Sequence, residues 1–396
     1  MTAGGPLRGV RVVEIGTLVA APFASRILAD FGADVIKIEP RGGDPLRRWR
    51  VMRDDTSLWW YIQGRNKKSL TLDLKAPRGV AIARKLIASA DVVIENLRPQ
   101  NMERLGFSWD ALRAINPRLI LVRISGFGQT GPMRDRPGFG AIGEAMGGIR
   151  YTTGEPERAP SRVGISLGDS LAGMQAVIGA LMSLLNVKNG GTGQVVDVSL
   201  VESVFAMMES TVTEFAESGI VRERSGGRLP GISPSNTYKS RDGSWIVIAG
   251  NSDAIFRRLM GTIGRFDLVS DPDLQANEGR VAKDDVIDSA ISAWAAKHDA
   301  SDMLAILEGA EVPSSKIYSA RDMMNDEQLK ARDMLLTGVL PDGAQIMMPG
   351  IVPKLSVTPG KVNWVGPSLG SHTDEILSSI GYDAAGIAEL RSEKVI

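Results

Sequence analysis

The residue types that could carry a reaction are few in this chain. Its 396 residues include no cysteine and only two histidines, His298 and His372. Thiolate nucleophiles, disulfides and thiolate metal sites are therefore excluded. A metal centre built on several histidines is not expected either, so the composition predicts no metal site. Any histidine that acts as a general base has to be one of these two.

One carboxylate, Asp169, stands where a glycine-rich turn meets a long apolar run in residues 164–187. Asp and Ser are good helix N-cap residues, so the structural interpretation is that Asp169 caps a buried helix. The positive end of the helix dipole would favour its ionised form. The functional interpretation is a carboxylate nucleophile, which forms a mixed anhydride with an activated acyl group and needs no general base. Local sequence leaves both interpretations open.

A second candidate nucleophile is Ser166, because residues 164–168 match the G-x-S-x-G motif and His372 follows in the expected order. A nucleophile elbow needs a buried apolar strand directly before the serine. Here the preceding residues read EPERAPSRV, and no HGGG-type oxyanion loop is present. A serine hydrolase is therefore the weaker hypothesis.

The elements that must position these residues read as alternating strands and helices. Residues 9–40 form a predicted β-α-β unit, and further strands are expected within 70–74, 91–99 and 118–128. This alternation predicts an α/β fold with a Rossmann-like, doubly wound parallel sheet, whose ligands bind beyond the carboxyl ends of the strands. The first turn, GTLVAAP, lacks the G-x-G-x-x-G fingerprint, so a usual dinucleotide site is not expected.

The length of the chain makes two domains the default. A stretch rich in Gly, Ser, Pro and Arg near residues 217–237 indicates a linker. We predict a large domain from residues 1–200, a linker helix at 201–225, a smaller α+β domain at 226–330, and a return segment at 331–396 that completes the large domain.

The charge balance gives no reason to expect a nucleic acid or a membrane as partner, since Lys plus Arg and Asp plus Glu number 46 each. No run of about 18 apolar residues stands out, so no transmembrane helix is expected. The N-terminus lacks a signal-peptide pattern, and the absence of cysteine fits a reducing compartment, so a cytoplasmic protein is expected. The arginine-rich loop at 41–53 is either a solvated face or a phosphate site.

Together these segments resemble the class III CoA-transferases, also called the CaiB/BaiF or formyl-CoA-transferase-like family. The resemblance is carried in order by LRGVRVVEIGTLVAAPFASRILADFGADVIKIEP, NKKSLTLDLK, DVVIENLRPQNMERLGFSWDAL, NPRLILVRISGFGQTGP, RDRPGFGAIGEAMGG, LGDSLAG, GQVVDVSLVES and LGSHTDEIL. One of these motifs alone would be a weak signal, but the ordered set covers nearly the whole chain.

The resemblance implies transfer of CoA from an acyl-CoA donor to a free small carboxylic acid. In that scheme Asp169 attacks the thioester, the CoA thiolate converts the resulting anhydride into an aspartyl-CoA thioester, and an acceptor acid then reverses these steps. A short dicarboxylate such as succinate is expected as one partner. CoA and acyl-CoA are substrates and no tightly bound cofactor is expected. The resemblance also implies a homodimer of two interlocked rings.

The resemblance also assigns residues to CoA contacts. These are Val19 and Ala20 in the first turn, Pro40 and Arg41 after the second strand, Leu72, Asp73, Leu74 and Lys75 beside adenine and ribose, Asn96, Leu97, Arg98 and Arg104 along pantetheine and phosphates, and Phe139 beside the thioester. The charges of Arg98 and Arg104 suit phosphate groups.

Several positions depart from the family pattern. The formyl-CoA enzymes have glutamine where this chain has Val19, arginine where it has Pro40, and tyrosine where it has Phe139. Their four-glycine loop is also missing, because the nearest stretch, residues 249–253, has one glycine. Specificity for formate or oxalate is therefore not expected.

Two alternatives remain within the resemblance. The α-methylacyl-CoA racemases share the fold but use a histidine after the Pro-Gly segment, which here reads PGFGAI. Without that base, half of a two-base proton transfer is missing, so a racemase is disfavoured. A CoA-binding protein without catalytic activity is the other alternative, and the presence of Asp169 argues against it only weakly.

Overall fold

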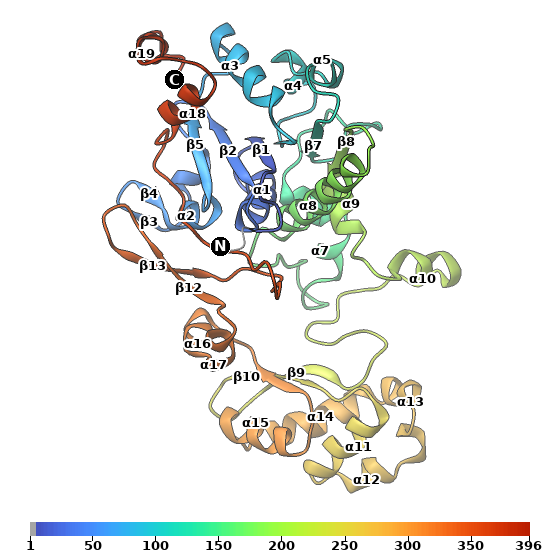
Figure 1. Cartoon of the computed structure of the whole chain (residues 1–396). Coiled ribbons are helices and arrows are strands. Elements are labelled where there is room, and N and C mark those ends of the chain that lie inside the picture. The colour runs from blue at the N-terminus through green and yellow to red at the C-terminus, as the bar shows by residue number, and fades with distance from the viewer. Residues whose placement is uncertain (1–4) are drawn as a thin grey trace. The chain divides into compact units, whose positions relative to one another are not determined.

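The computed structural model describes residues 5–396, which divide into two compact units. The first unit comprises the residues up to Ile149, Val163–Glu209 and Gln328–Ile396. The second comprises Arg150–Arg162 and Ser210–Glu327. Each unit is therefore assembled from stretches that are separated in the sequence (Figure 1).

A six-stranded parallel sheet with the order β5-β2-β1-β6-β7-β8 forms the centre of the first unit (Figure 1). Its strands are β1 (Arg11–Ile15), β2 (Asp34–Glu39), β5 (Lys67–Thr71), β6 (Val92–Glu95), β7 (Ile120–Ser125) and β8 (Val195–Ser199). The predicted α/β fold with a parallel sheet is confirmed. The strand order reverses between β1 and β6, and in such sheets ligands bind at the carboxyl ends of the strands next to this reversal.

Helices cover both faces of this sheet. They are α1 (Ala20–Asp30), α2 (Leu58–Gln63), α3 (Pro77–Ala88), α4 (Asn101–Arg104), α5 (Trp109–Ile115), α6 (Gly140–Met146), α8 (Leu167–Lys188), α9 (Leu200–Phe205), α18 (Thr373–Ser379) and α19 (Ala384–Ser392). Successive strand residues point to opposite faces, so Val12 joins the core formed with α1 and α8, whereas Val13 joins the core formed with α3, α18 and α19. The end of the chain thus packs on the sheet that its beginning forms.

Short elements complete the first unit at its periphery. They are the 3-10 helix η1 (Pro45–Arg48) and the strand pairs β3 (Met52–Arg53) with β4 (Thr56–Ser57), and β12 (Leu335–Val339) with β13 (Gln345–Pro349). Both strand pairs are antiparallel. The helices α7 (Ile149–Thr152) and α17 (Glu327–Ala331) span sequence boundaries between the units.

The second unit contains a three-stranded antiparallel sheet with the order β11-β10-β9. Its elements are β9 (Ser235–Lys239), β10 (Trp245–Ala249), β11 (Ser314–Lys316), α10 (Thr211–Ser218), α11 (Asp253–Thr262), α12 (Phe266–Ser270), η2 (Pro272–Leu274), α13 (Asn277–Ala282), α14 (Asp284–Ala295), α15 (Ala300–Gly309) and α16 (Ala320–Asn325). On β10 the alternate residues Ile246 and Ile248 are buried with Phe256 and Ile291 in one apolar core. This alternation is typical of a sheet with one covered face.

The longest helix, α8, has the length and composition of a membrane span, with a mean hydropathy of 1.5 in its most apolar window. Gly, Ser and Gln residues interrupt its apolar run but do not lower the average below that of a membrane span. The expectation that the chain has no transmembrane helix stays a prediction. One such helix is weak evidence for a membrane, since helices in the core of a soluble protein pass the same test. The small residues Ala172, Ala176 and Ala180 of α8 lie in the core formed with α1, which is the packing of a core helix.

Candidate active site

Two adjoining cavities lie at the carboxyl ends of the parallel strands of the first unit. The larger, which we call the strand-end cavity, has a volume of about 670 Å³ and lies where β1, β2 and β5 end. The smaller, the Asp169 cavity, has a volume of about 120 Å³ and lies where β6, β7 and β8 end. Thr17 and Leu97 line both cavities, so one ligand can extend from the first into the second.

The structure brings all the sequence-predicted site residues to these two cavities. The strand-end cavity is lined by Ile15, Gly16, Thr17, Ile38, Pro40, Arg41, Leu72, Asp73, Leu74, Lys75, Leu97, Asn101, Arg104 and Leu105. The Asp169 cavity is lined by Thr17, Leu18, Val19, Ala20, Asn96, Leu97, Arg98, Pro99, Ile124, Ser125, Gly126, Arg136, Pro137, Gly138, Phe139, Asp169 and Leu200. Sequence reasoning missed Thr17, Asn101 and Arg136, although all three belong to quoted family motifs.

Asp169 lies in the first turn of α8 but is not its cap. The helix begins at Leu167 and its N-cap is Ser166, whose side chain makes no cap hydrogen bond. The prediction that Asp169 is the N-cap was therefore wrong by three residues, because the helix begins earlier than the local cap signal indicates. The carboxylate still lies in the turn where the helix dipole stabilises negative charge.

The carboxylate of Asp169 lies directly against Gly140, the first residue of α6. A Cβ atom added at Gly140 would lie 2.2 Å from Oδ2 of Asp169 and 2.8 Å from its carboxyl carbon. On α8, a Cβ atom at Gly168 would lie 2.9 Å from the carbonyl oxygen of Gly140. The close approach of α6 and α8 therefore depends on glycine at both positions. The backbone N–H of Gly168 also donates to the buried Glu144 (3.3 Å).

The turn after β1 is held in one conformation by side chains on both sides. The amide of Asn96 accepts from the backbone nitrogen of Thr17 (2.8 Å) and donates to its carbonyl oxygen (2.9 Å). Leu18 has a φ of 65°, which is uncommon for a residue other than glycine, and its N–H donates to Asp44 (3.0 Å). Asn96 therefore positions the turn that lines both cavities, while its predicted contact with CoA stays a prediction.

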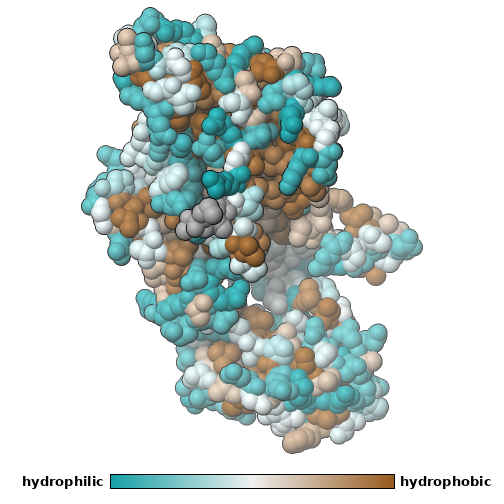
Figure 2. Space-filling model, viewed as in Figure 1, coloured by the Kyte–Doolittle hydropathy of each residue, from teal (hydrophilic) through white to brown (hydrophobic). Residues whose placement is uncertain are grey.

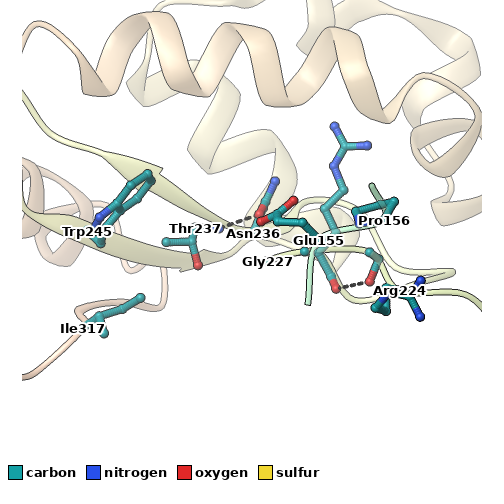
Figure 3. Close-up of a pocket in the computed structure, with 11 residues that line it drawn as sticks. Glu155, Pro156, Arg224, Gly227, Asn236, Thr237, Trp245 and Ile317 are labelled. Atoms are coloured by element: carbon teal, nitrogen blue, oxygen red, sulfur yellow. Dashed lines mark hydrogen bonds between the residues drawn. The ribbon is translucent and has the colours of Figure 1, made fainter. Parts of the chain in front are cut away.

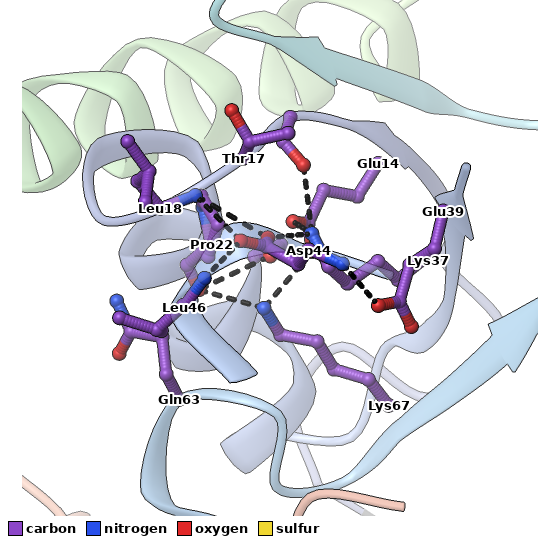
Figure 4. Close-up of polar contacts among 12 residues, drawn as sticks. Glu14, Thr17, Leu18, Pro22, Lys37, Glu39, Asp44, Leu46, Gln63 and Lys67 are labelled. Atoms are coloured by element: carbon purple, nitrogen blue, oxygen red, sulfur yellow. Dashed lines mark hydrogen bonds and ion pairs between the residues drawn. The ribbon is translucent and has the colours of Figure 1, made fainter. Parts of the chain in front are cut away.

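A cluster of fully buried charged side chains contacts the backbone of this turn (Figure 4). The ammonium of Lys37 lies 2.6 Å from a carboxylate oxygen of Glu14, 2.8 Å from Asp44 and 2.7 Å from the carbonyl oxygen of Gly16. The ammonium of Lys67 lies 2.9 Å from the other oxygen of Glu14. The cluster thus connects β1, β2 and β5 to the backbone that borders the cavities.

These contacts predict a specific dependence of stability on pH. Burial alone would raise the pKa of Glu14, but Lys37 and Lys67 outweigh it and lower the pKa to about 2. The stabilisation is complete above pH 4.5, the ordinary pKa, and is lost as the pH falls toward 2. It amounts to about 3 kcal/mol at neutral pH.

We therefore expect the difference in unfolding free energy between the wild type and Glu14→Gln to be large at pH 7 and to shrink below pH 4.5. Urea unfolding at a series of pH values measures it. The control is Glu389→Gln, which removes an exposed carboxylate 3.2 Å from Arg78 and should have little effect at any pH. A difference for Glu14→Gln that does not change with pH would contradict the assignment.

The arginines of loop 41–53 have different surroundings. Arg47 forms an ion pair with the buried Glu39 (2.7 Å) and stacks on the ring of Trp60 (3.6 Å). Arg50 stacks on Trp59, and Arg53 pairs with Asp342 (2.9 Å). Only Arg41 of this loop lines the strand-end cavity. Arg47 is thus held inside the fold, Arg48 and Arg50 are exposed, and Arg41 borders the cavity, so both interpretations of this loop stay open.

The positions of the histidines support neither a serine hydrolase nor a racemase. The Nδ1 atom of His372 lies 3.2 Å from the backbone nitrogen of Ser69, in β5, and 3.1 Å from the hydroxyl of the neighbouring Ser371. Ser166 is the N-cap of α8. No histidine lines either of the two cavities, within the part of the chain that the structure describes. A Ser–His pair and a histidine-based racemase site are thus both unsupported.

A separate cavity of about 920 Å³ lies in the second unit (Figure 3). Glu155, Arg224 and Asn236 line it together with the side chains of Trp245 and Ile317. None of the sequence-predicted site residues borders this cavity. Across residues 5–396, no group of three or more His, Asp or Glu side chains is placed to hold a metal ion.

Comparisons with known proteins identify the family of the chain. The family model described as CoA-transferase family III matches residues 7–373. Succinyl-CoA–D-citramalate CoA-transferase from Chloroflexus aurantiacus is 46% identical and covers 99% of this chain and 98% of its own. Succinate–glutarate CoA-transferase from Agrobacterium fabrum is 34% identical and covers 95% and 96%. A CAIB/BAIF family protein from Brucella suis superimposes with a TM-score of 0.84 at 31% identity, covering 96% and 100% of the two chains.

Proposed function

Since the chain belongs to CoA-transferase family III, we propose that it moves CoA from an acyl-CoA donor to a free dicarboxylic acid through covalent intermediates on Asp169. The sequence-based prediction of a CoA-transferase of this family is confirmed by the match over nearly the whole chain. The observation that carries the proposed mechanism is that the Asp169 cavity adjoins a cavity with three cationic side chains.

The proposed path of CoA follows these two cavities. Arg41, Lys75 and Arg104 line the strand-end cavity, and their charges suit the phosphates of CoA. The pantetheine arm would pass Thr17 and Leu97, which border both cavities, and bring the thioester to Asp169. Val19 and Ala20 are buried, so they would contribute backbone groups to this path.

The proposed reaction is a series of acyl exchanges at one carboxylate. An oxygen of Asp169 attacks the thioester carbonyl, the C–S bond breaks, and an acyl-aspartyl anhydride and CoA thiolate result. The thiolate attacks the aspartyl carbonyl, the anhydride C–O bond breaks, and the donor acid leaves as a carboxylate. The acceptor carboxylate then repeats these two steps in reverse. Each step exchanges one anion for another, so no proton has to move and no histidine is needed.

The dicarboxylate class rests on the relatives. The names of two of them give succinyl-CoA with D-citramalate, and succinate with glutarate. The three free acids are short dicarboxylates, and succinyl-CoA is the CoA thioester of one. We propose the same class of acid for this chain. A panel of acyl-CoA donors and acceptor acids tests it, with succinyl-CoA and dicarboxylate acceptors expected to give the highest kcat/KM. Release of free CoA without transfer to any acid would instead indicate a hydrolase.

Arg104 provides a test of the path proposed for CoA. Its guanidinium lines the strand-end cavity and lies 3.4 Å from Asn101. We expect Arg104→Gln to raise the KM for acyl-CoA roughly 10- to 100-fold, since a charge-assisted hydrogen bond to phosphate is lost. A truncated N-acetylcysteamine thioester has no phosphates, so its kcat/KM should not change. Equal losses with both thioesters would place the phosphates elsewhere.

We also propose the domain layout and the interlocked homodimer that the resemblance implies, with the first unit as the large domain and the second as the small domain. One face of α8 supports a dimer, because Met174, Ile178, Leu181, Met182 and Leu185 are exposed at helical spacing. Figure 2 shows apolar residues in brown over the region of α8 and α9. A second copy of the chain, rather than a membrane, would cover this face.

Light scattering after size-exclusion chromatography tests the proposed dimer. The expected mass is twice the 42.4 kDa of one chain and should persist on dilution to nanomolar concentration, because interlocked chains cannot separate without unfolding. A monomer mass in the absence of detergent would contradict the proposal. A protein that stays in solution only with detergent would instead favour a membrane at α8.

A further inference from the structure

A buried arginine that lines neither cavity connects the parallel sheet to α4. Arg123, on β7, is 7% exposed and stands opposite Glu95 of β6 in the strand register. Its Nε atom donates to a carboxylate oxygen of Glu95 (2.8 Å), and its Nη1 atom donates to a carboxylate oxygen of Glu103 on α4 (2.8 Å). One guanidinium therefore joins two carboxylates that come from different elements.

The two carboxylates lie at the two ends of a segment that borders both cavities. This segment, residues 96–104, follows β6 and ends with α4. Leu97 lines both cavities, and Asn101 and Arg104 line the strand-end cavity. Glu95 directly precedes the segment, and its second carboxylate oxygen accepts from the backbone nitrogen of Leu97 (2.7 Å). The network around the buried guanidinium therefore contacts the beginning and the end of segment 96–104.

Helix α4 is too short to hold this segment in place by its own hydrogen bonds. It has four residues, and its N-cap, Gln100, makes no side-chain cap hydrogen bond. A single helical turn is not stable alone, because fixing its backbone costs more free energy than its few hydrogen bonds return. The orientation of α4 therefore depends on tertiary contacts, which include the burial of Met102 in the apolar core and the ion pair of Glu103 with Arg123.

Net stability does not account for this buried network. Burial raises the pKa of Glu95 to about 7, although Arg123 and the N–H of Leu97 both act to lower it. Desolvation thus outweighs pairing at Glu95, and apolar side chains of similar size would stabilise such a site as well or better. The guanidinium supplies geometry instead, since its planar fork also donates to the second oxygen of Glu103 (3.3 Å) and so fixes the direction of that carboxylate.

We propose that Arg123 is a positioning residue for CoA, because its two carboxylate partners hold segment 96–104 in the conformation that lines the strand-end cavity. This inference rests on the proposed function, since it concerns the path of CoA, and adds a residue that touches neither the substrate nor the reacting atoms. The guanidinium of Arg104 loses less conformational entropy on binding a phosphate when the backbone that carries it is already fixed.

Calorimetry of CoA binding tests this role without requiring transfer. Above the pKa of Glu95, which is about 7, we expect Arg123→Gln to raise the Kd for CoA roughly 3- to 30-fold. The matched control is Arg65→Gln, which breaks another buried pair, with Asp30 (2.7 Å), and lines neither cavity. Both variants should lose stability, but Arg65→Gln should keep the Kd of the wild type. A wild-type Kd in Arg123→Gln, or equal increases in the two variants, would overturn the inference.

A second variant, Glu103→Gln, acts on α4 alone and keeps the pair between Arg123 and Glu95. The side chain of Glu103 is 38% exposed, so the variant should fold. We expect the KM for acyl-CoA to rise roughly 2- to 10-fold with kcat unchanged. The kcat/KM for the N-acetylcysteamine thioester should not change, because this substrate has no phosphates for Arg104 to bind. A Kd for CoA that depends on Arg123 supports the role even if no transfer is found. Transfer with an unchanged KM for acyl-CoA, or equal losses with both thioesters, would overturn the role while leaving the CoA-transferase intact.

Discussion

Replacement of Asp169 by alanine is expected to lower the rate of CoA transfer by at least about 10³-fold. The mechanism has no substitute for this residue, because no cysteine exists in the chain and no histidine lines the two cavities within the described residues. Asp169→Asn should be about as inactive, since an amide is a far weaker nucleophile than a carboxylate.

The loss should be one of chemistry and not of folding. Asp169 is half-buried in the first turn of α8, where its interaction with the helix dipole contributes about 0.3–1 kcal/mol. Thermal unfolding and CoA binding should therefore stay close to those of the wild type. Ser166→Ala, three residues earlier, is the control and should retain activity, since that side chain makes no cap hydrogen bond. An inactive Ser166→Ala with an active Asp169→Ala would reverse the assignment of the nucleophile.

Gly140→Ala is expected to have the second largest effect, a loss of roughly 100-fold in kcat. The added Cβ atom would lie 2.2 Å from Oδ2 of Asp169, so the carboxylate or the start of α6 has to shift. A displacement of about 1 Å is enough to remove the alignment of a nucleophile. The KM for acyl-CoA should change much less, because Gly140 does not line the strand-end cavity.

A matched control for this substitution lies in the turn before α8. A Cβ atom at Gly164 would meet no atom within 4 Å, so Gly164→Ala should leave kcat nearly unchanged. Overpacking at Gly140 is expected to cost about 1–3 kcal/mol in stability, so activity is compared at a temperature where both variants are folded. Full activity in folded Gly140→Ala would show that the position of Asp169 tolerates displacement.

The sheet and the set of site residues could be predicted from the sequence for a physical reason. Parallel strands are buried on both faces and read as short apolar runs, and their carboxyl ends gather on one edge. The residues after each run therefore had to converge, and Pro40, Leu72 and Asn96 do so at the two cavities. The start of α8 was predicted three residues too late. The helix already includes Gly168, which packs on Gly140, and no local sequence signal reveals this contact.

The buried charges could not be predicted from single segments. Lys67 stands in a run of basic residues, and charged residues are seldom fully buried unless they are paired. Its partner Glu14 is 53 positions away and lies two strands across the sheet. The strand register places Glu14 directly opposite Lys37. The sequence signal for this pair was one charged residue inside each of two apolar strands. Arg136 stands in a segment that carries the family resemblance, but only the fold brings its loop to the cavity of Asp169.

The covalent intermediate is the central claim, and mass spectrometry tests it most directly. The enzyme is mixed with succinyl-CoA, quenched in acid and digested with trypsin, and the peptide between Arg162 and Lys188 is analysed. Because this peptide contains both Ser166 and Asp169, fragment ions have to locate any added mass. We expect CoA attached as a thioester at Asp169, with the adduct removed when an acceptor acid is added. An adduct at Ser166, or turnover with Asp169 left unmodified and Asp169→Ala active, would contradict the mechanism.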